Sequence, residues 1–242
     1  MKVVTWNIQF GREIEQATRD LTEQASLADT DVLLVQELDE AGAQMLARAL
    51  GGYHFEYVAA SVHPRTGRQF GNAVLSPTPL HDREVIELPH KARFSGQPRV
   101  ALKVVASIDG VTTALCSTHT EIPALGSAKR QDQFAALADA ASAWSTERAI
   151  IGGDFNTVSK RGVRSLVARF DEAGFAHVSP RVVATVRRAG RGFTLDHVFA
   201  RGLTPTVSGV VHDAVASDHS PVWVTLAPTS VTPSRRTPPE PG

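Results

Sequence analysis

The sequence predicts one α/β domain in which two β-sheets are covered by outer helices. Strand and helix patterns alternate along the first 50 residues, strand patterns dominate residues 53–118, and an alanine-rich helix pattern with further strands follows. With 242 residues and 42% hydrophobic content, the chain can bury a sizeable core. Because each sheet and each helix must bury an apolar face against another layer, this order favours two sheets with helices outside.

The N-terminal segment predicts a β-α-β-α succession. Residues 2–8 form an apolar strand pattern, and residues 13–27 place apolar side chains on one helical face. Residues 32–35 are a continuous apolar run, which is typical of a strand covered on both faces. A short helix is expected at residues 41–50, where two glycines close it.

The middle of the chain is dominated by strands separated by turns. Strands are predicted here at residues 53–60, 70–76, 85–88, 99–108 and 111–118. Asp109 and Gly110 separate the last two of these strands, and this dipeptide is a strong signal for a two-residue hairpin. The alanine-rich residues 127–144 predict a helix with Phe134 and Leu137 on its buried face.

The last third of the chain begins with a buried strand around Ile150. Beyond it the sequence predicts a short helix at residues 164–170 and strands at residues 182–186, 194–199, 207–211 and 222–226. Residues 187–192 are rich in arginine and glycine and are expected to form a loop. Residues 228–242 lack apolar periodicity, so we expect a folded domain over residues 1–227 and a disordered tail over residues 228–242.

Charge and composition exclude several classes of protein. Lys+Arg and Asp+Glu both number 25, so a dedicated nucleic-acid coat is not expected, although a local basic patch remains open. The one cysteine, Cys116, cannot form an intramolecular disulfide and is expected to be a small buried residue. We find no signal-peptide pattern and no apolar run of membrane-spanning length, and therefore expect a cytoplasmic protein without membrane contact. We also expect it to be a monomer.

The segment from Ile150 to Asn156 is the first candidate for chemistry. A short apolar run is followed by two glycines, and Asp154 and Asn156 come one residue apart. In an extended chain these two side chains project to the same side. A carboxylate can bind a hard cation and an amide can orient water, but Gly, Asp and Asn also form ordinary turns. This segment alone leaves both interpretations open.

Other polar residues share the same setting at the ends of predicted strands. The full set is Asn7, Glu37, His119, Asp154, Asn156, Asp196, Asp218 and His219. Taken singly, each of these residues has an ordinary structural explanation: a histidine can be part of the core, and a carboxylate or amide can belong to a turn or a helix cap. Because strand ends of an α/β sandwich cluster in space, the set together predicts a site. So many carboxylates and histidines would be costly to bury without a cation or a phosphate.

The ordered motifs resemble those of the endonuclease/exonuclease/phosphatase superfamily, which includes deoxyribonuclease I. The motifs are Thr5-Trp6-Asn7-Ile8, Gln36-Glu37, Gly71-Asn72-Ala73-Val74-Leu75-Ser76, Ser117-Thr118-His119, Gly153-Asp154-Phe155-Asn156, Leu195-Asp196-His197-Val198-Phe199 and Ser217-Asp218-His219-Ser220-Pro221. Each is short, but the set keeps the family's order across residues 3–226. The resemblance implies an α/β fold, namely a four-layer α/β/β/α sandwich with two mixed β-sheets.

The resemblance also implies a metal-dependent phosphoesterase that uses Mg²⁺ or Mn²⁺. Glu37 would be the main metal ligand, assisted by Asn7 and Asp218. Magnesium suits such a site because it takes few protein carboxylates and keeps waters.

The remaining roles follow from the same resemblance. His219 would be the general base, oriented by Asp196, while Asp154 and Asn156 would position the nucleophile and a phosphate oxygen. His119 would contact the phosphate or the leaving group, as in the deoxyribonuclease I branch. The reaction implied is attack of water on phosphorus.

The expected substrate is a phosphodiester, and nucleic acid is the phosphodiester that we favour, so the protein would be a nuclease. Substrate contacts are assigned to Asn72 and to the segment that carries Arg187, Arg188, Arg191 and Phe193, although a solvated basic turn would look the same. In the apurinic-endonuclease branch of the family, a longer insertion with aromatic and basic residues typically follows the strand that corresponds to the one ending at His119. Here that connection is short, over residues 120–127, which argues against specificity for abasic sites. The alternative is a phosphomonoesterase or phosphodiesterase acting on a small-molecule, sugar, inositol or lipid phosphate.

Overall fold

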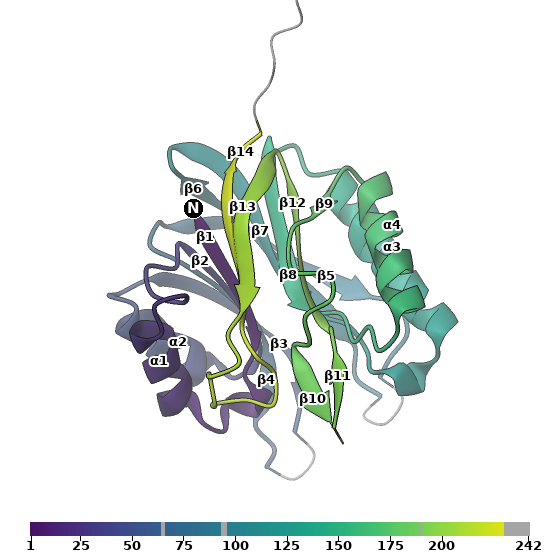
Figure 1. Ribbon diagram of the computed structural model, residues 1–242, viewed down its shortest axis with the longest axis horizontal. Helices are drawn as coiled ribbons and strands as arrows, with labels where there is room; N and C mark the ends of the chain where they lie inside the picture. The colour runs from purple at the N-terminus through teal and green to yellow at the C-terminus, as the bar shows by residue number, and fades with distance from the viewer. Residues whose placement is uncertain (64–65, 93–95, 189, 230–242) are drawn as a thin grey trace, which may run out of the picture.

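The computed structural model describes residues 1–63, 66–92, 96–188 and 190–229. Within these residues the chain forms two six-stranded sheets and a separate two-stranded ribbon. The two sheets lie face to face, with one pair of helices outside each of them (Figure 1). The predicted four-layer α/β/β/α arrangement is therefore confirmed.

The first sheet combines the N-terminal strands with the last two strands. Its order is β13 (Leu203–Val210), β14 (Val222–Pro228), β1 (Lys2–Asn7), β2 (Val32–Leu38), β4 (Gln69–Ser76) and β3 (His54–Val62). Strands β1 and β2 are parallel and the other neighbours are antiparallel, so the sheet is mixed. The covering helices are α1 (Ile14–Glu23) and α2 (Glu40–Ala49), which follow β1 and β2.

The second sheet repeats this plan with a parallel pair at its centre. Its order is β5 (Leu80–Leu88), β6 (Arg99–Ile108), β7 (Val111–His119), β8 (Arg148–Asp154), β12 (Asp196–Arg201) and β9 (Ala176–His177). Strands β7 and β8 are parallel, joined by α3 (Ser127–Ser142), and α4 (Lys160–Glu172) follows β8. Short 3-10 turns occur at η1 (Gln9–Gly11) and η2 (Pro123–Leu125).

Strand alternation distributes the apolar residues into three buried layers. In β2, Val32 and Leu34 face the opposite sheet, whereas Leu33 and Val35 face α1 and α2. The layer under α3 and α4 is rich in phenylalanine, including Phe155. Cys116 belongs to this layer, where burial raises the pKa of its thiol, as expected for a structural cysteine.

The arginine-rich segment differs from its prediction. It forms a hairpin of β10 (Val186–Arg188) and β11 (Arg191–Phe193), and not a loop between longer strands. The strand predicted at residues 182–186 is wrong except for its last residue. Its valines have strand propensity, but Val182 is 89% exposed and no neighbouring strand among the described residues pairs with this segment.

The C-terminal strand extends slightly further than its sequence pattern indicates. Strand β14 includes Pro228, and the backbone N–H of Thr229 donates to the carbonyl of Gly202 at 3.2 Å. The rest of the predicted tail, residues 230–242, lies outside the described residues. Among the helices described, none is both long and apolar enough to cross a membrane.

A buried histidine pair ties β9 to β12 and to the segment after β8. The Thr157 hydroxyl donates to the carbonyl of Thr194 (2.8 Å), so it accepts from Nε2 of His197 (2.7 Å). Nδ1 of His197 is then free to accept from Nε2 of His177, 3.0 Å away. Both rings are thus held neutral. Burial lowers the pKa of His177 to about 4 and that of His197 to about 3.

This pair should make the fold sensitive to acid. Because the folded-state pKa values lie below the ordinary value of about 6.5, the unfolded chain binds more protons below that pH. We expect the free energy of unfolding to fall by on the order of 3 kcal/mol between about pH 6.5 and 4.5. Urea titrations across this range should show a smaller slope in the His177→Gln/His197→Gln double variant. The exposed His54→Gln variant is the control, and a slope shared by all three proteins would contradict the assignment.

Candidate active site

The polar strand ends meet at one edge of the sandwich. In the second sheet, Asp154 is the register partner of both His119 in β7 and Asp196 in β12. In the first sheet, Asn7 at the end of β1 pairs with Gln36 near the end of β2. Since both parallel pairs run in register to the same edge, side chains from the two sheets approach one another there.

Asp154 lies at the centre of this cluster and contacts residues from both sheets. Its Oδ1 accepts from the backbone N–H of Asn156 at 2.9 Å, and its Oδ2 accepts from Nδ2 of Asn7 at 3.1 Å. Nε2 of His119 and Nε2 of His219 lie 3.4 and 3.7 Å from the same Oδ2. Burial raises the pKa of Asp154 to about 7, although the charge of His219 opposes this.

Two glycines before Asp154 allow the close approach of its neighbours. A Cβ atom on Gly153 would lie 1.9 Å from the carbonyl oxygen of Thr118 in β7. A Cβ atom on Gly152 would lie 2.7 Å from Leu34 in the opposite sheet. The Gly-Gly-Asp sequence thus brings the carboxylate close to β7 and to the first sheet at once, for which no other residue is small enough.

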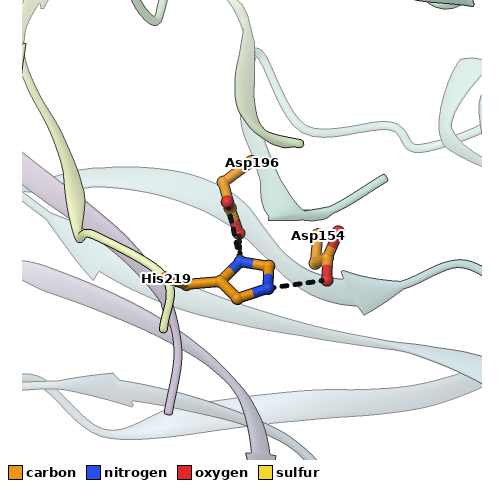
Figure 2. A group of neighbouring side chains, drawn as sticks. All are labelled: Asp154, Asp196 and His219. Atoms are coloured by element: carbon orange, nitrogen blue, oxygen red, sulfur yellow. Dashed lines mark hydrogen bonds and ion pairs between the residues drawn. The ribbon is translucent and has the colours of Figure 1, made fainter. Parts of the chain in front are cut away.

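His219 and Asp196 form a directed pair. Nδ1 of His219 lies 2.9 and 3.1 Å from the two carboxylate oxygens of Asp196, and Nε2 faces Asp154 (Figure 2). The His219 carbonyl accepts from the Trp6 indole at 2.8 Å, which fixes the backbone. Burial by itself lowers the pKa of His219, but Asp196 and Asp154 raise it to about 10.

The loop that carries His219 also rests on the arginine hairpin. Val186 of β10 forms an isolated bridge with His219, and the N–H of Ser220 donates to the carbonyl of Thr185 at 2.8 Å. Asp218 pairs with Arg188, 2.9 Å between Oδ2 and Nη2, and its charge raises the pKa of both His219 and Glu37. The structure therefore places Asp218 at the rim of the site.

Glu37 reaches the cluster through a β-bulge. Residues 33 and 35 face α1 and α2, and after the bulge Leu38 takes the next position on that face. Glu37 is the extra residue, and its φ of 57° is a left-handed conformation that is uncommon for a non-glycine residue. Its carboxylate consequently lies 3.8 Å from Nδ1 of His119. Burial raises the pKa of Glu37, opposed by Arg99 and by a hydrogen bond with Asn7.

Two residues without a predicted role set the state of His119. Nη1 of Arg99 lies 3.3 Å from Nδ1 of His119, and Nε of Arg99 pairs with Glu121 at 3.2 Å. Because a guanidinium only donates, Nδ1 must accept and the proton of His119 sits on Nε2, toward Asp154. Burial and then Arg99 lower the pKa of His119 far below its ordinary value. In the sequence, only the position of Glu121, two residues after His119, could have pointed to the Arg99–Glu121 pair.

The two other predicted amide residues have structural partners. Nδ2 of Asn72 donates to the carbonyl of Val100 at 2.7 Å and joins β4 to β6. Nδ2 of Asn156 donates to the backbone carbonyl of Thr120 at 3.1 Å, and the backbone carbonyl of Asn156 accepts from Nη1 of Arg130 at 2.6 Å. Of these two amides, Asn156 also borders an open cavity.

That cavity, here called the hairpin cavity, has a volume of about 620 Å³. Asn156, Arg188, Arg191 and Phe193 line it, which places three of the predicted substrate contacts beside the cluster. Arg187 lies between Val186 and Arg188 in β10, so its side chain projects to the other face of the hairpin. It is not among the described residues that line the cavity.

The donor set suits a divalent cation. Ligand atoms of Asp154, Asp196 and His219 lie within 4.8 Å of one another and form one possible metal group. In this group, however, Nδ1 of His219 is already bonded to Asp196. Glu37 and Asp154 present another pair of largely buried carboxylates, both with raised pKa values; Asn7 donates to Asp154 and lowers the pKa of Glu37. Hard oxygen donors whose burial is costly without a counter-charge are what a divalent cation stabilises.

Several solved structures share this fold. An endonuclease/exonuclease/phosphatase from Beutenbergia cavernae is 21% identical, with a TM-score of 0.75 over 94% of this chain and 71% of that one. A humanized D. rerio TDP2 is 20% identical, with a TM-score of 0.72 over 94% and 98% of the two chains. Sphingomyelinase C from Streptomyces griseocarneus is 20% identical, with a TM-score of 0.68 over 93% and 98%. These similarities establish the fold.

A search of curated proteins gave no match. The family model described as the Endonuclease/Exonuclease/phosphatase family matches residues 4–219, which include all the residues of the cluster. Members of this family are hydrolytic phosphoesterases that use divalent metals, and the buried carboxylate and histidine groups fit that chemistry. The chain therefore belongs to the endonuclease/exonuclease/phosphatase family.

Proposed function

We propose that this protein is a divalent-metal-dependent phosphodiesterase that acts on nucleic acid, with His219 as its general base. The observation that carries the proposal is the direction of the His219 ring. Nδ1 is held by Asp196, so Nε2 faces the cluster beside Asp154. A carboxylate on one imidazole nitrogen fixes the tautomer and leaves the other nitrogen to take a proton from water.

The metal would be held by Glu37 and Asp154, which Asn7 holds together. Nδ2 of Asn7 donates to Asp154 at 3.1 Å and Asn7 lowers the pKa of Glu37, while Oδ1 of Asn7 accepts from the N–H of Gln9 at 3.0 Å. We therefore assign Asn7 a positioning role for these carboxylates. Asp218, at the rim of the site, is not assigned as a metal ligand. A bound Mg²⁺ or Mn²⁺ would supply charge neutralisation at a phosphate oxygen. Balancing the charge of Asp154 would also lower the pKa of His219 and so favour the neutral, basic imidazole.

The remaining side chains would complete attack of water on phosphorus, in which the P–O bond to the leaving ester oxygen breaks as the new P–O bond forms and the leaving oxygen takes a proton from solvent. Nε2 of His219 would take the proton of the water, and Asp196 would stabilise the imidazolium that results. His119 is neutral and carries its proton on Nε2, so it can donate to a phosphate oxygen without changing its charge. Arg99 keeps this tautomer because Glu121 holds the guanidinium in place.

A nucleic-acid substrate is supported by the charge of the hairpin cavity. Arg188 and Arg191 are direct cross-strand partners, and like charges in this position destabilise a hairpin. Asp218 offsets only Arg188. A phosphate of the substrate chain, next to the scissile one, would balance the remaining charge. D. rerio TDP2, which shares the fold, has been solved in complex with a single-strand DNA product.

Removal of the metal should abolish turnover. With Mg²⁺ or Mn²⁺ we expect hydrolysis of single-stranded DNA, plasmid DNA or RNA, and loss of this activity in excess chelator. Glu37→Ala should lower kcat/KM by on the order of 10²-fold or more, because the hard ligand is lost. It should also weaken Mn²⁺ binding in calorimetric titrations, whereas the exposed Glu40→Ala variant should not.

The same substrate panel includes nucleotide and sugar monophosphates, inositol phosphates and sphingomyelin. Turnover of monoesters alone would replace the nuclease assignment by a phosphatase. Turnover of sphingomyelin alone would replace it by a lipid phosphodiesterase. Full activity in chelator would contradict the metal-dependent mechanism itself.

Asp196 and His219 should act as one unit. Each alanine variant is expected to lower kcat by on the order of 10²-fold or more, and the double variant should lose little beyond either single one. The exposed His212→Ala and Asp213→Ala variants lie in the same loop and should keep full activity. Losses that multiply in the double variant would rule out a shared role.

Arg191 should contribute to substrate affinity through its charge. Arg191→Ala is expected to raise KM on single-stranded DNA and to reduce the slope of log KM against log salt by about 1, as for the loss of one phosphate contact. Arg187→Ala is the matched control, because this arginine lies on the other face of the same hairpin. Equal effects of the two variants would show a general effect of net charge, with no specific contact at Arg191.

A further inference from the structure

A second cavity, of about 340 Å³, is lined by residues that lie close in sequence to Asn7 and Asn72, although no residue of the catalytic cluster is among its described lining residues. It is lined by Phe10, His63, Phe70, Arg12, Arg68 and neighbouring residues. Phe10 follows Asn7 by three residues, and Phe70 precedes Asn72 by two. The volume is at the lower end of the range of roughly 300–1,000 Å³ that small-ligand sites occupy. Among the described residues, none that lines this cavity also lines the hairpin cavity.

Three aromatic rings form the walls of this cavity. The Phe10 ring meets Phe70 edge to face at 4.8 Å between centroids, and meets His63 at 5.0 Å. The backbone N–H of Thr66 donates to Nδ1 of His63 at 3.3 Å, which orients the imidazole. Phe10 and Phe70 remain partly accessible although both are large and apolar. Partly exposed rings at the wall of a cavity are a platform on which planar groups stack.

Phe10 is held in this place by a strained backbone. Gln9 and Phe10 have φ values of 49° and 62°, in the left-handed region that bulky residues rarely occupy. The N–H of Gln9 donates to Oδ1 of Asn7, so the strained turn begins at the catalytic cluster. Strain of this kind persists where surrounding contacts impose it, and it is concentrated at binding sites.

The charged residues at the rim select the ligand. Arg12 lies over the Phe10 ring with its guanidinium carbon 5.4 Å from the centroid, and Arg68 pairs with Asp39. An aromatic cavity could also bind a quaternary ammonium group such as choline. Because Asp39 offsets the charge of Arg68, the guanidinium of Arg12 is the group that would repel this cation. Arg12 favours a planar group that carries an anion, as a nucleobase with its phosphate does.

We infer that this cavity binds the nucleobase of a nucleotide adjacent to the scissile phosphate. The base would stack on the Phe10 ring with the perpendicular Phe70 ring beside it, and Arg12 would face the phosphate of that nucleotide. The inference rests on the proposed phosphodiesterase activity and narrows its substrate to diesters that carry a base on this side. Together with the hairpin cavity, it would give the substrate two separate contacts outside the cluster.

Three chromogenic diesters with the same p-nitrophenyl leaving group test this assignment. They are the p-nitrophenyl ester of thymidine 5′-monophosphate, methyl p-nitrophenyl phosphate and p-nitrophenylphosphorylcholine. The wild type should prefer the thymidine ester. Phe10→Asn removes the ring while tolerating the left-handed backbone. It should lower kcat/KM for the thymidine ester by about tenfold and leave the methyl ester unchanged. Phe10→Tyr keeps the ring and should behave as the wild type.

A binding measurement separates this site from catalysis. Fluorescence anisotropy of a short labelled oligothymidylate, recorded in chelator, should show Kd rising by about tenfold in Phe10→Asn and little in Phe10→Tyr. If no diester is hydrolysed but this difference in Kd is found, the catalytic assignment fails and the base site stands. An equal loss on all three esters, a preference for the choline ester, or unchanged oligonucleotide binding in Phe10→Asn would overturn the inference. Melting temperatures of the variants verify that they are folded.

Discussion

The arrangement of the site depends on the burial of Glu37, Asp154 and Asp196 at the meeting edge of two sheets. Bringing three carboxylates out of water is costly unless hydrogen bonds and positive charge compensate. The fold supplies part of this compensation through Asn7, His219 and the Arg99 group. The remainder is a local excess of negative charge that suits a divalent cation. Burying these carboxylates without a counter-charge is unfavourable, and the proposed divalent cation would relieve that cost.

Two parallel strand pairs make this meeting edge possible. Most neighbours in both sheets are antiparallel, yet β1–β2 and β7–β8 run side by side in the same direction. Parallel neighbours end together, so each pair delivers two polar residues to one edge. Helices α1 and α3 span the crossovers and cover the outer faces (Figure 1). The layered core therefore fixes the relative positions of residues that are more than 100 positions apart, such as Asn7 and Asp154.

Sequence patterns predicted the layers and most of the cluster because both depend on local signals. Apolar periodicity locates strands, and polar residues at strand ends locate the site. Patterns could not predict the bulge that turns Glu37 inward, since alternation alone would point it toward α1 and α2. Arg99 acts on His119 only through the register of β6 against β7. The separation of Arg187 from Arg188 likewise required the hairpin that replaced the expected loop.

The seating of the His219 loop on the arginine hairpin limits how this enzyme can be altered. The bridge to Val186 and the bond from Ser220 to Thr185 make the hairpin part of the frame that holds the imidazole. A segment that is proposed to contact the substrate and that also supports the proposed proton acceptor cannot be exchanged as a module. Grafting a hairpin from a relative with another preference would shift the ring unless the backbone of residues 185–186 were retained. Changes of specificity are therefore more accessible through side chains beyond Val186 than through the length or register of the ribbon.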